Sequence, residues 1–230
     1  MPRRATGLDE LVAYLVPEGT ALAGVLRPWL AASPRFRAFA EAHRDKIRKK
    51  ARALADDDGR SDLAFELDAA RRILGDRRFS VEYEPYGIAR RAPDFRVTFR
   101  EGVRFNVEAR RLRRPGRDAG AAAPLARAIC DKLGQLPPSI ANVLIVGGPG
   151  TPPEALPLAV AWLDERAARR DDAAFVARGL AGARDYARRA QRLSAAIAVS
   201  EGGAPQVWRN PRARHPLPED LARALVATLT

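Results

Sequence analysis

Two carboxylates and an arginine flank a pair of short segments in the middle of the chain. Asp94 is the first residue of the segment 94–100, and Glu108 and Arg110 lie at the end of residues 103–110. Apolar and polar residues alternate in both segments, which is typical of strands that bury one face. The two segments therefore predict a β-hairpin, whose polar face would gather acidic and basic side chains from both strands.

The apolar residues of the two segments determine how the strands pair. A two-residue turn would mix the apolar and polar faces, so we expect a three-residue turn over residues 100–102. Gly102 then takes the position that favours a left-handed backbone. The expected pairs are Phe99 with Val103, Val97 with Phe105, and Phe95 with Val107.

In this register Asp94 lies opposite Glu108 on the polar face. Directly paired residues have Cβ atoms about 5 Å apart, and like charges at that distance are destabilising. Two such carboxylates need a proton, a cation or an arginine between them. A hard divalent metal such as Mg²⁺ takes oxygen ligands and keeps waters and phosphate oxygens in its shell. With Arg110 on the same face, the set has the components that bind a phosphodiester and stabilise its developing charge.

A second interpretation of the same face needs no metal. The hairpin carries three arginines in its two strands, namely Arg96, Arg104 and Arg110. These arginines would neutralise the two carboxylates across the strands and form a ladder of ion pairs. The residue types alone leave both interpretations open.

The rest of the chain alternates helical and strand patterns. Residues 8–55 read as helical, residues 56–59 (Asp-Asp-Asp-Gly) as a solvated loop, and Ser61 or Asp62 as the start of a helix that ends at Gly75. The pattern predicts further strands at 79–83, 143–146, 194–199 and 206–208, and further helices at 124–133, 154–169, 173–191 and 218–229. Strands mixed with helices indicate an α/β fold with a mixed sheet. We expect a helical N-terminal extension over residues 1–58 and an α/β core over residues 59–230.

The hairpin resembles that of the PD-(D/E)XK nuclease superfamily, which includes restriction endonucleases. Pro93-Asp94 enters one strand, and Glu108 and Arg110 form a Glu-x-Arg motif on the next. The superfamily core has a glutamate on the helix before the hairpin, and Glu66 falls there. A helix and a strand follow the hairpin, as residues 124–133 and 143–146 do here. The resemblance covers about residues 61–146 and implies a restriction endonuclease-like mixed sheet flanked by helices.

The resemblance also implies a site. Asp94 and Glu108 would hold Mg²⁺ (or Mn²⁺), and Glu66 would complete or orient the metal site. Arg110 stands where the superfamily has a lysine. A lysine can lose its proton when it is desolvated, whereas arginine stays charged. Arg110 would therefore hold the scissile phosphate, and activation of the water would fall to the metal.

The implied function is that of a metal-dependent nuclease, a hydrolase of nucleic-acid phosphodiester bonds, with DNA as the expected substrate. The alternative is a catalytically inactive nuclease-fold module that binds nucleic acid or a partner protein. Because Arg110 replaces the motif lysine, the sequence does not decide between them. Many nucleases of this fold act as dimers, so the resemblance is also compatible with a homodimer.

The formal net charge of +12 favours a polyanionic partner. The expected contacts with nucleic acid are Arg44, Arg48, Lys49, Arg96 and Arg113. A coding bias toward arginine offers another explanation, because only four of the 40 basic residues are lysines.

Composition also limits the compartment. No apolar stretch approaches the roughly 18 residues that a membrane-spanning helix needs, so no membrane partner is expected. The N-terminal residues do not read as a signal peptide. Cys130 is the single cysteine of the chain, which excludes an internal disulfide and fits a reducing compartment. We therefore expect a cytoplasmic protein.

Overall fold

The computed structural model divides into two compact units, Met1–Arg77 and Arg78–Thr230, which are described separately below. The helix that carries Glu66 belongs to the first unit, together with the helices before it. The sequence pattern placed the boundary earlier, after residue 58. The residues that the structure describes are 7–85, 93–100, 102–113, 122–148, 151–152, 154–200 and 203–230.

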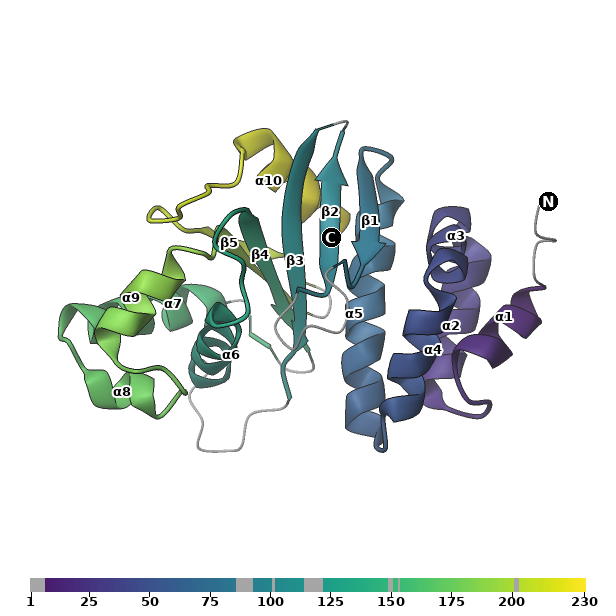
Figure 1. Cartoon of the computed structure of the whole chain (residues 1–230), viewed down its shortest axis with the longest axis horizontal. Coiled ribbons are helices and arrows are strands. Elements are labelled where there is room, and N and C mark those ends of the chain that lie inside the picture. Colours follow the sequence, from purple (N-terminus) through teal and green to yellow (C-terminus); the bar gives the residue numbers. More distant parts are fainter. Residues whose placement is uncertain are drawn as a thin grey trace. The chain divides into compact units, whose positions relative to one another are not determined.

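The described part of the first unit is helical (Figure 1). Its core is made of leucines and aromatic residues spaced at helical intervals, such as Leu26, Phe36 and Leu67, each at most 1% exposed. Its helices are α1 (Leu8–Leu15), α2 (Ala21–Ala32), α3 (Pro34–Ala42), α4 (Arg44–Ala53) and α5 (Asp57–Gly75).

Helix α5 begins four residues earlier than the sequence pattern suggested. Asp56 is its N-cap, with a side-chain oxygen that accepts a hydrogen bond of 2.7 Å from the backbone N–H of Gly59. Asp57 and Asp58 lie in the first turn, where carboxylates interact favourably with the positive end of the helix dipole. The expected solvated loop is therefore wrong, because the acidic triplet caps and begins the helix.

The second unit is built on a six-stranded mixed sheet in the order β1-β2-β3-β4-β5-β6 (Figure 1). Three strands form an antiparallel meander, β4 and β5 continue parallel to β3, and β6 returns antiparallel to β5. The strands are β1 (Phe79–Tyr83), β2 (Phe95–Phe99), β3 (Val103–Arg111), β4 (Ala141–Gly147), β5 (Ala195–Val199) and β6 (Gln206–Arg209). The expected α/β class with a mixed sheet is confirmed.

The hairpin of β2 and β3 has the predicted register. Phe99 pairs with Val103, and the next two apolar pairs follow as expected. The prediction for the turn was wrong in one respect. The left-handed conformation that the structure records here belongs to Arg100, with φ of 53°, rather than to Gly102. The turn therefore takes the left-handed conformation at its first residue and not at its glycine.

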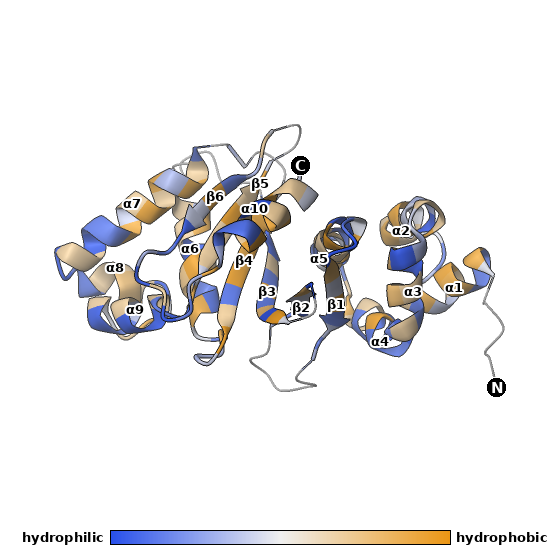
Figure 2. Cartoon of the chain, turned by 90° about the horizontal axis from the view of Figure 1, so that it is seen from above, coloured by the Kyte–Doolittle hydropathy of each residue, from blue (hydrophilic) through white to orange (hydrophobic). Residues whose placement is uncertain are grey.

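Helices cover both faces of the sheet (Figures 1 and 2). One face of β4 and β5 packs against four helices in a core that includes Leu144 and Ala196, while α10 lies on the other face. Figure 2 shows β4 as hydrophobic along most of its length, as a strand buried on both sides should be. The helices are α6 (Ala123–Leu133), α7 (Ala155–Ala168), α8 (Asp172–Val176), α9 (Ala183–Ala190) and α10 (Glu219–Thr228).

The helix expected over residues 173–191 is two helices, α8 and α9. Gly179 and Gly182 lie between them with φ of 76° and 133°, values that other residues rarely adopt, so the chain turns here. Asp172 accepts a 2.8 Å hydrogen bond from the backbone N–H of Ala183 and so caps the start of α9. None of the helices in the described residues is long and apolar enough to cross a membrane.

Candidate active site

Glu108 is a buried carboxylate in the middle of the sheet. It lies on β3, and the residue is 1% exposed. Its Oε1 atom accepts a hydrogen bond from the ammonium group of Lys132 on α6. Its Oε2 atom is also buried and has no hydrogen-bond partner of normal distance and angle in the described part of the chain. One acceptor of this carboxylate is therefore available for a further ligand.

Asp94 lies beside Glu108, as the register predicted. It directly precedes β2, and the pairing of Phe95 with Val107 places it opposite Glu108. Its Oδ2 atom accepts a 2.9 Å hydrogen bond from the backbone N–H of Ala109, which holds the aspartate against β3. The structure thus brings the two predicted carboxylates together on one side of the sheet.

The two carboxylates influence each other electrostatically. The pKa of Glu108 is raised from its ordinary value of 4.5 to about 7, chiefly by burial and next by the negative charge of Asp94. The Lys132 ammonium and the backbone N–H of Asp94 lower the pKa and offset only part of that rise. Burial and the neighbouring Asp94 thus disfavour the ionised form of Glu108, and a cation next to this carboxylate would favour it.

Lys132 is the residue that the sequence reasoning missed. Its helix was expected, yet no role was given to the side chain, which is 16% exposed and points to Glu108 from 24 residues away in the sequence. Gln135, one turn further along, accepts a second, longer hydrogen bond of 3.4 Å from the same ammonium group. A signal was present in the composition, because Lys132 is the only lysine of residues 78–230 in a chain dominated by arginine.

Arg110 lies on the same side of β3 as Glu108 but at the exposed end of the strand. Within the described ranges it forms no ion pair with either carboxylate, so the cation on Glu108 is the ammonium of Lys132. Arg96, also expected on this face, forms an ion pair of 3.7 Å with Glu82 across β1 and β2. The structure does not form the expected ladder on Glu108, whose charged partner comes from α6.

Glu66 is a buried residue of the first unit, on α5. Lys50 on α4 donates hydrogen bonds of 2.7 Å to both of its carboxylate oxygens. Within its own unit this carboxylate therefore already has a cationic partner. Glu66 was expected on this helix to complete or orient a metal site, whereas its lysine partner was not expected.

The basic residues expected to contact nucleic acid have different surroundings. The guanidinium groups of Arg44 and Arg48 lie over the ring of Tyr14, with the carbon of each group 5.2 Å and 4.4 Å from the ring centre. Lys49 and Arg113 are exposed. Of these residues, Arg44 and Arg48 are partly held by an aromatic contact inside the unit, which stabilises α4 against α1.

The residues of the second unit fit a hard divalent cation with few protein ligands. The described residues contain no group of three or more histidine, cysteine or acidic side chains that is placed to hold a metal ion. Mg²⁺ does not need such a cluster, because it is usually bound through one or two carboxylates and keeps waters and substrate phosphates. Asp94 and Glu108 provide two carboxylates, and Oε2 of Glu108 is a buried oxygen to which none of the described residues donates a hydrogen bond.

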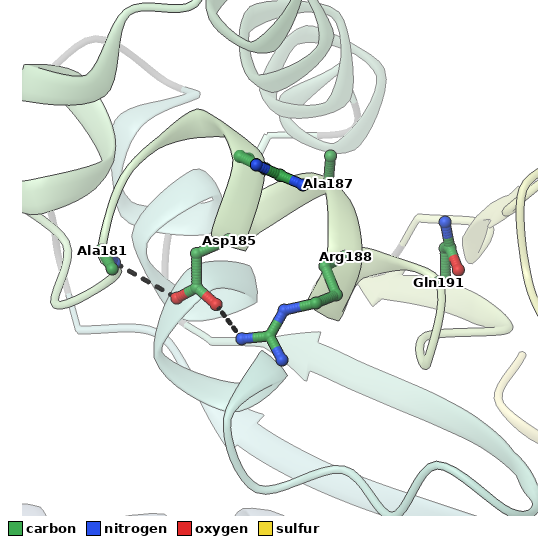
Figure 3. Close-up of a pocket in the computed structure, with 6 residues that line it drawn as sticks. Ala181, Asp185, Ala187, Arg188 and Gln191 are labelled. Atoms are coloured by element: carbon green, nitrogen blue, oxygen red, sulfur yellow. Dashed lines mark hydrogen bonds and ion pairs between the residues drawn. The ribbon is translucent and has the colours of Figure 1, made fainter.

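A second feature is an open hollow along α9 (Figure 3). Asp185 lies at its edge and accepts hydrogen bonds from the backbone N–H of Ala181 (3.2 Å) and from Arg188 (2.6 Å), as the dashed lines show. A hydrogen bond from Arg189 is the main reason why the pKa of Asp185 falls to about 2. Its acid is fully engaged in holding α9, so the hollow has no spare carboxylate for a metal. The lining residues are Ala181, Arg184, Asp185, Ala187, Arg188 and Gln191.

Comparison with known proteins assigns no family to this chain. No family model matches it, and neither a curated protein nor a solved structure is significantly similar to it. The function of this chain is therefore inferred from the geometry of the site and from the order of the elements around it.

Proposed function

We propose that the second unit is a metal-dependent phosphodiesterase that acts on nucleic acid, with DNA as the favoured substrate. Asp94 and Glu108 would hold Mg²⁺ or Mn²⁺, and Lys132 would supply the positive charge next to the scissile phosphate. The observation that carries the proposal is the buried Glu108, which has Asp94 beside it, a lysine on one oxygen and, among the described residues, no hydrogen-bond partner of normal geometry on the other.

The order of elements supports a restriction endonuclease-like core. A helix (α5) precedes three antiparallel strands, and α6 and a strand parallel to β3 follow them. This is the order that the resemblance to the PD-(D/E)XK superfamily implied. In this proposal Lys132, which comes from α6 instead of β3, would take the place of the lysine that the Glu-x-Arg motif lacks.

The side chains of this unit can perform distinct parts of phosphodiester hydrolysis. A divalent cation at the carboxylates would supply Lewis-acid polarisation of the phosphodiester and a more acidic water. Asp94 is oriented by the Ala109 N–H, which fixes its carboxylate beside Glu108 before any ligand binds. Lys132 carries a mobile charge that can follow the phosphate, and Arg110 keeps a permanent charge at the exposed end of the strand.

The charge of the chain supports nucleic acid as the partner. With a formal charge of +12, the chain would release condensed counterions on binding to a polyanion. Several cationic side chains are exposed in the described ranges, among them Lys49, Arg104, Arg110 and Arg184. Such contacts are independent of sequence and become weaker as salt is added.

The direct test is cleavage of DNA and RNA with Mg²⁺ or Mn²⁺ by the wild type, Asp94→Asn and Glu108→Gln. The matched control is Asp131→Asn, because Asp131 is an exposed acid on α6 close in sequence to Lys132. We expect the control to cleave like the wild type and the two site variants to lose cleavage. Retention of metal-dependent cleavage in both site variants would contradict the proposed site.

A second candidate function is a silent nuclease-fold module that binds nucleic acid without cleaving it. The ion pair of Lys132 with Glu108 favours it, because the ammonium neutralises the carboxylate without any metal. This function predicts salt-sensitive binding of nucleic acid that is the same with Mg²⁺ and with EDTA. It also predicts that Glu108→Gln leaves that binding unchanged.

A further inference from the structure

The ammonium group of Lys132 lies where the carboxylates of Asp94 and Glu108 need a positive charge. Glu108 is buried and Asp94 lies opposite it, so the pair would repel if both were ionised without a cation. The ammonium of Lys132 touches Oε1 of Glu108 and thereby supplies one charge from within the chain. The fold thus has a cation of its own at the site where the proposed function places a metal.

We propose that Lys132 is a resident counter-cation that competes with the divalent metal for Glu108, so that metal entry displaces its ammonium group from Oε1 toward the substrate phosphate. This inference rests on the proposed function, since it concerns the same two carboxylates. It adds that the ion pair between Lys132 and Glu108 controls metal affinity. The stronger this ion pair is, the weaker is the binding of the metal.

The competition follows from the contacts of the two oxygens. Oε1 accepts from the ammonium, whereas Oε2 is buried and no described residue donates a hydrogen bond to it. A cation that approaches Oε2 meets the positive charge of Lys132 on the other oxygen of the same carboxylate. Two cations at one buried carboxylate repel strongly, because the protein interior screens charges less than water does. Metal binding is therefore most favourable when the ammonium moves away.

The ammonium group of Lys132 also has another acceptor within reach. Its side chain is an unbranched stem of four carbons that ends in a group with three donors, so it can exchange acceptors without backbone movement. Gln135 Oε1, in the turn that follows α6, already lies 3.4 Å from the ammonium and is a second acceptor for it. The side chain is 16% exposed, so its end can reach solvent or a bound phosphate.

The test is calorimetric titration of the full chain with MnCl₂ and MgCl₂ in the absence of nucleic acid. Lys132→Met keeps the length of the side chain and removes the charge, while Lys132→Arg keeps the charge. We expect Lys132→Met to bind the metal about tenfold more tightly than the wild type. In the wild type the ammonium must first leave Glu108 before the metal can bind well, and in the variant this cost is absent. Lys132→Arg should bind no more tightly than the wild type.

A second readout covers the case in which Lys132→Met folds poorly. In EDTA its melting temperature should be lower than that of the wild type, and Mn²⁺ should restore it by more than Mn²⁺ raises that of the wild type. Gln135→Leu leaves Lys132 in place and removes the second acceptor. It should weaken metal binding severalfold, because the displaced ammonium has lost its alternative partner.

The outcomes separate the two proposals. Tighter metal binding in Lys132→Met, or metal binding that appears only in that variant, supports the exchange of the Lys132 ammonium for the metal on Glu108. Equal or weaker binding in Lys132→Met overturns the exchange and leaves the proposed metal site standing. An absence of metal binding in the wild type and in every variant overturns the proposed metal site itself, and the exchange with it.

Discussion

The backbone N–H of Ala109 donates a 2.9 Å hydrogen bond to Oδ2 of Asp94 and ties the start of β2 to β3 at the position next to Glu108. Ordinary pairing between the strands begins one residue later, at Phe95. The aspartate side chain therefore takes the place of a main-chain acceptor at the end of the hairpin. The carboxylate has a structural role and a proposed metal-binding role at once, and these can be separated by substitution.

Asp94→Asn should separate them. The amide oxygen can still accept the hydrogen bond from Ala109, whereas the negative charge is lost. We expect the free energy of unfolding in EDTA to stay within about 0.5 kcal/mol of the wild type, and metal binding to be lost. Asp94→Ala should lose metal binding and also about 1 kcal/mol of stability. Urea denaturation and calorimetry measure the two effects. Equal destabilisation by both substitutions would contradict the structural role of this hydrogen bond.

The second prediction concerns which basic residue serves the chemistry. Lys132→Met removes the buried charge beside Glu108 and should lower the rate of cleavage about 10²–10³-fold, the usual cost of losing one group that stabilises transition-state charge. Arg110→Ala removes an exposed charge and should lower the rate of cleavage less than about tenfold. Single-turnover cleavage of one DNA substrate under saturating metal compares them. A larger loss of cleavage rate in Arg110→Ala than in Lys132→Met would show that Arg110, and not Lys132, takes the role of the motif lysine.

The sequence predicted the hairpin site more completely than its surroundings. The period of two in the apolar residues was sufficient for the register, and the register places Asp94 opposite Glu108. The contact of Lys132 with Glu108 could not be read in the same way, because it joins a helix to a strand 24 residues away. No periodicity within one element encodes such a contact. The partner of Glu66 was missed for the same reason, since Lys50 lies on another helix.

Local signals also misled where two physical effects compete. The acidic triplet before Gly59 was expected to be a loop because it is polar and ends in glycine, yet Asp56 caps a helix there. Favourable interaction of the carboxylates with the helix dipole outweighs the poor helix propensity of aspartate and glycine. In the hairpin turn, Arg100 accepts the left-handed conformation although a glycine is two residues away, since the register of the strands decides the geometry.

The third prediction is a pH dependence at α9. The pKa of Asp185 is lowered from 3.8 to about 2, so the folded state favours the ionised form more than the unfolded state does. Its stabilising contribution is therefore complete above its ordinary pKa and is lost as the pH falls through about 2. Asp185→Asn should destabilise the protein by about 1–2 kcal/mol at pH 7, and the difference should shrink below pH 4. Urea denaturation at several pH values measures it. A difference that grows as the pH falls would contradict the assigned sign.

The last prediction concerns the polar pair that supports β3 and β4 from inside the core. Asn106 donates a 3.0 Å hydrogen bond to Oδ1 of Asn142, and both residues are fully buried. The Asn142 amide donates in turn to the carbonyl groups of Pro137, Ile140 and Arg192, each at 2.8–2.9 Å. One side chain therefore satisfies acceptors from the segment before β4 and from the segment before β5.

Asn142→Ala leaves these acceptors without a donor in a dry environment and opens a small cavity, so it should cost about 3 kcal/mol of unfolding free energy. Asn142→Asp should cost at least as much at neutral pH, because it replaces the donor with a charge that faces carbonyl oxygens. Urea denaturation in EDTA measures both. The exposed Gln191→Ala is a control and should stay within about 0.5 kcal/mol of the wild type.

Because β3 also carries Glu108, Asn142→Ala should weaken metal binding only as far as it unfolds the protein. A variant that stays folded at 20 °C and yet fails to bind Mn²⁺ would show that this pair positions the carboxylates as well as the strands.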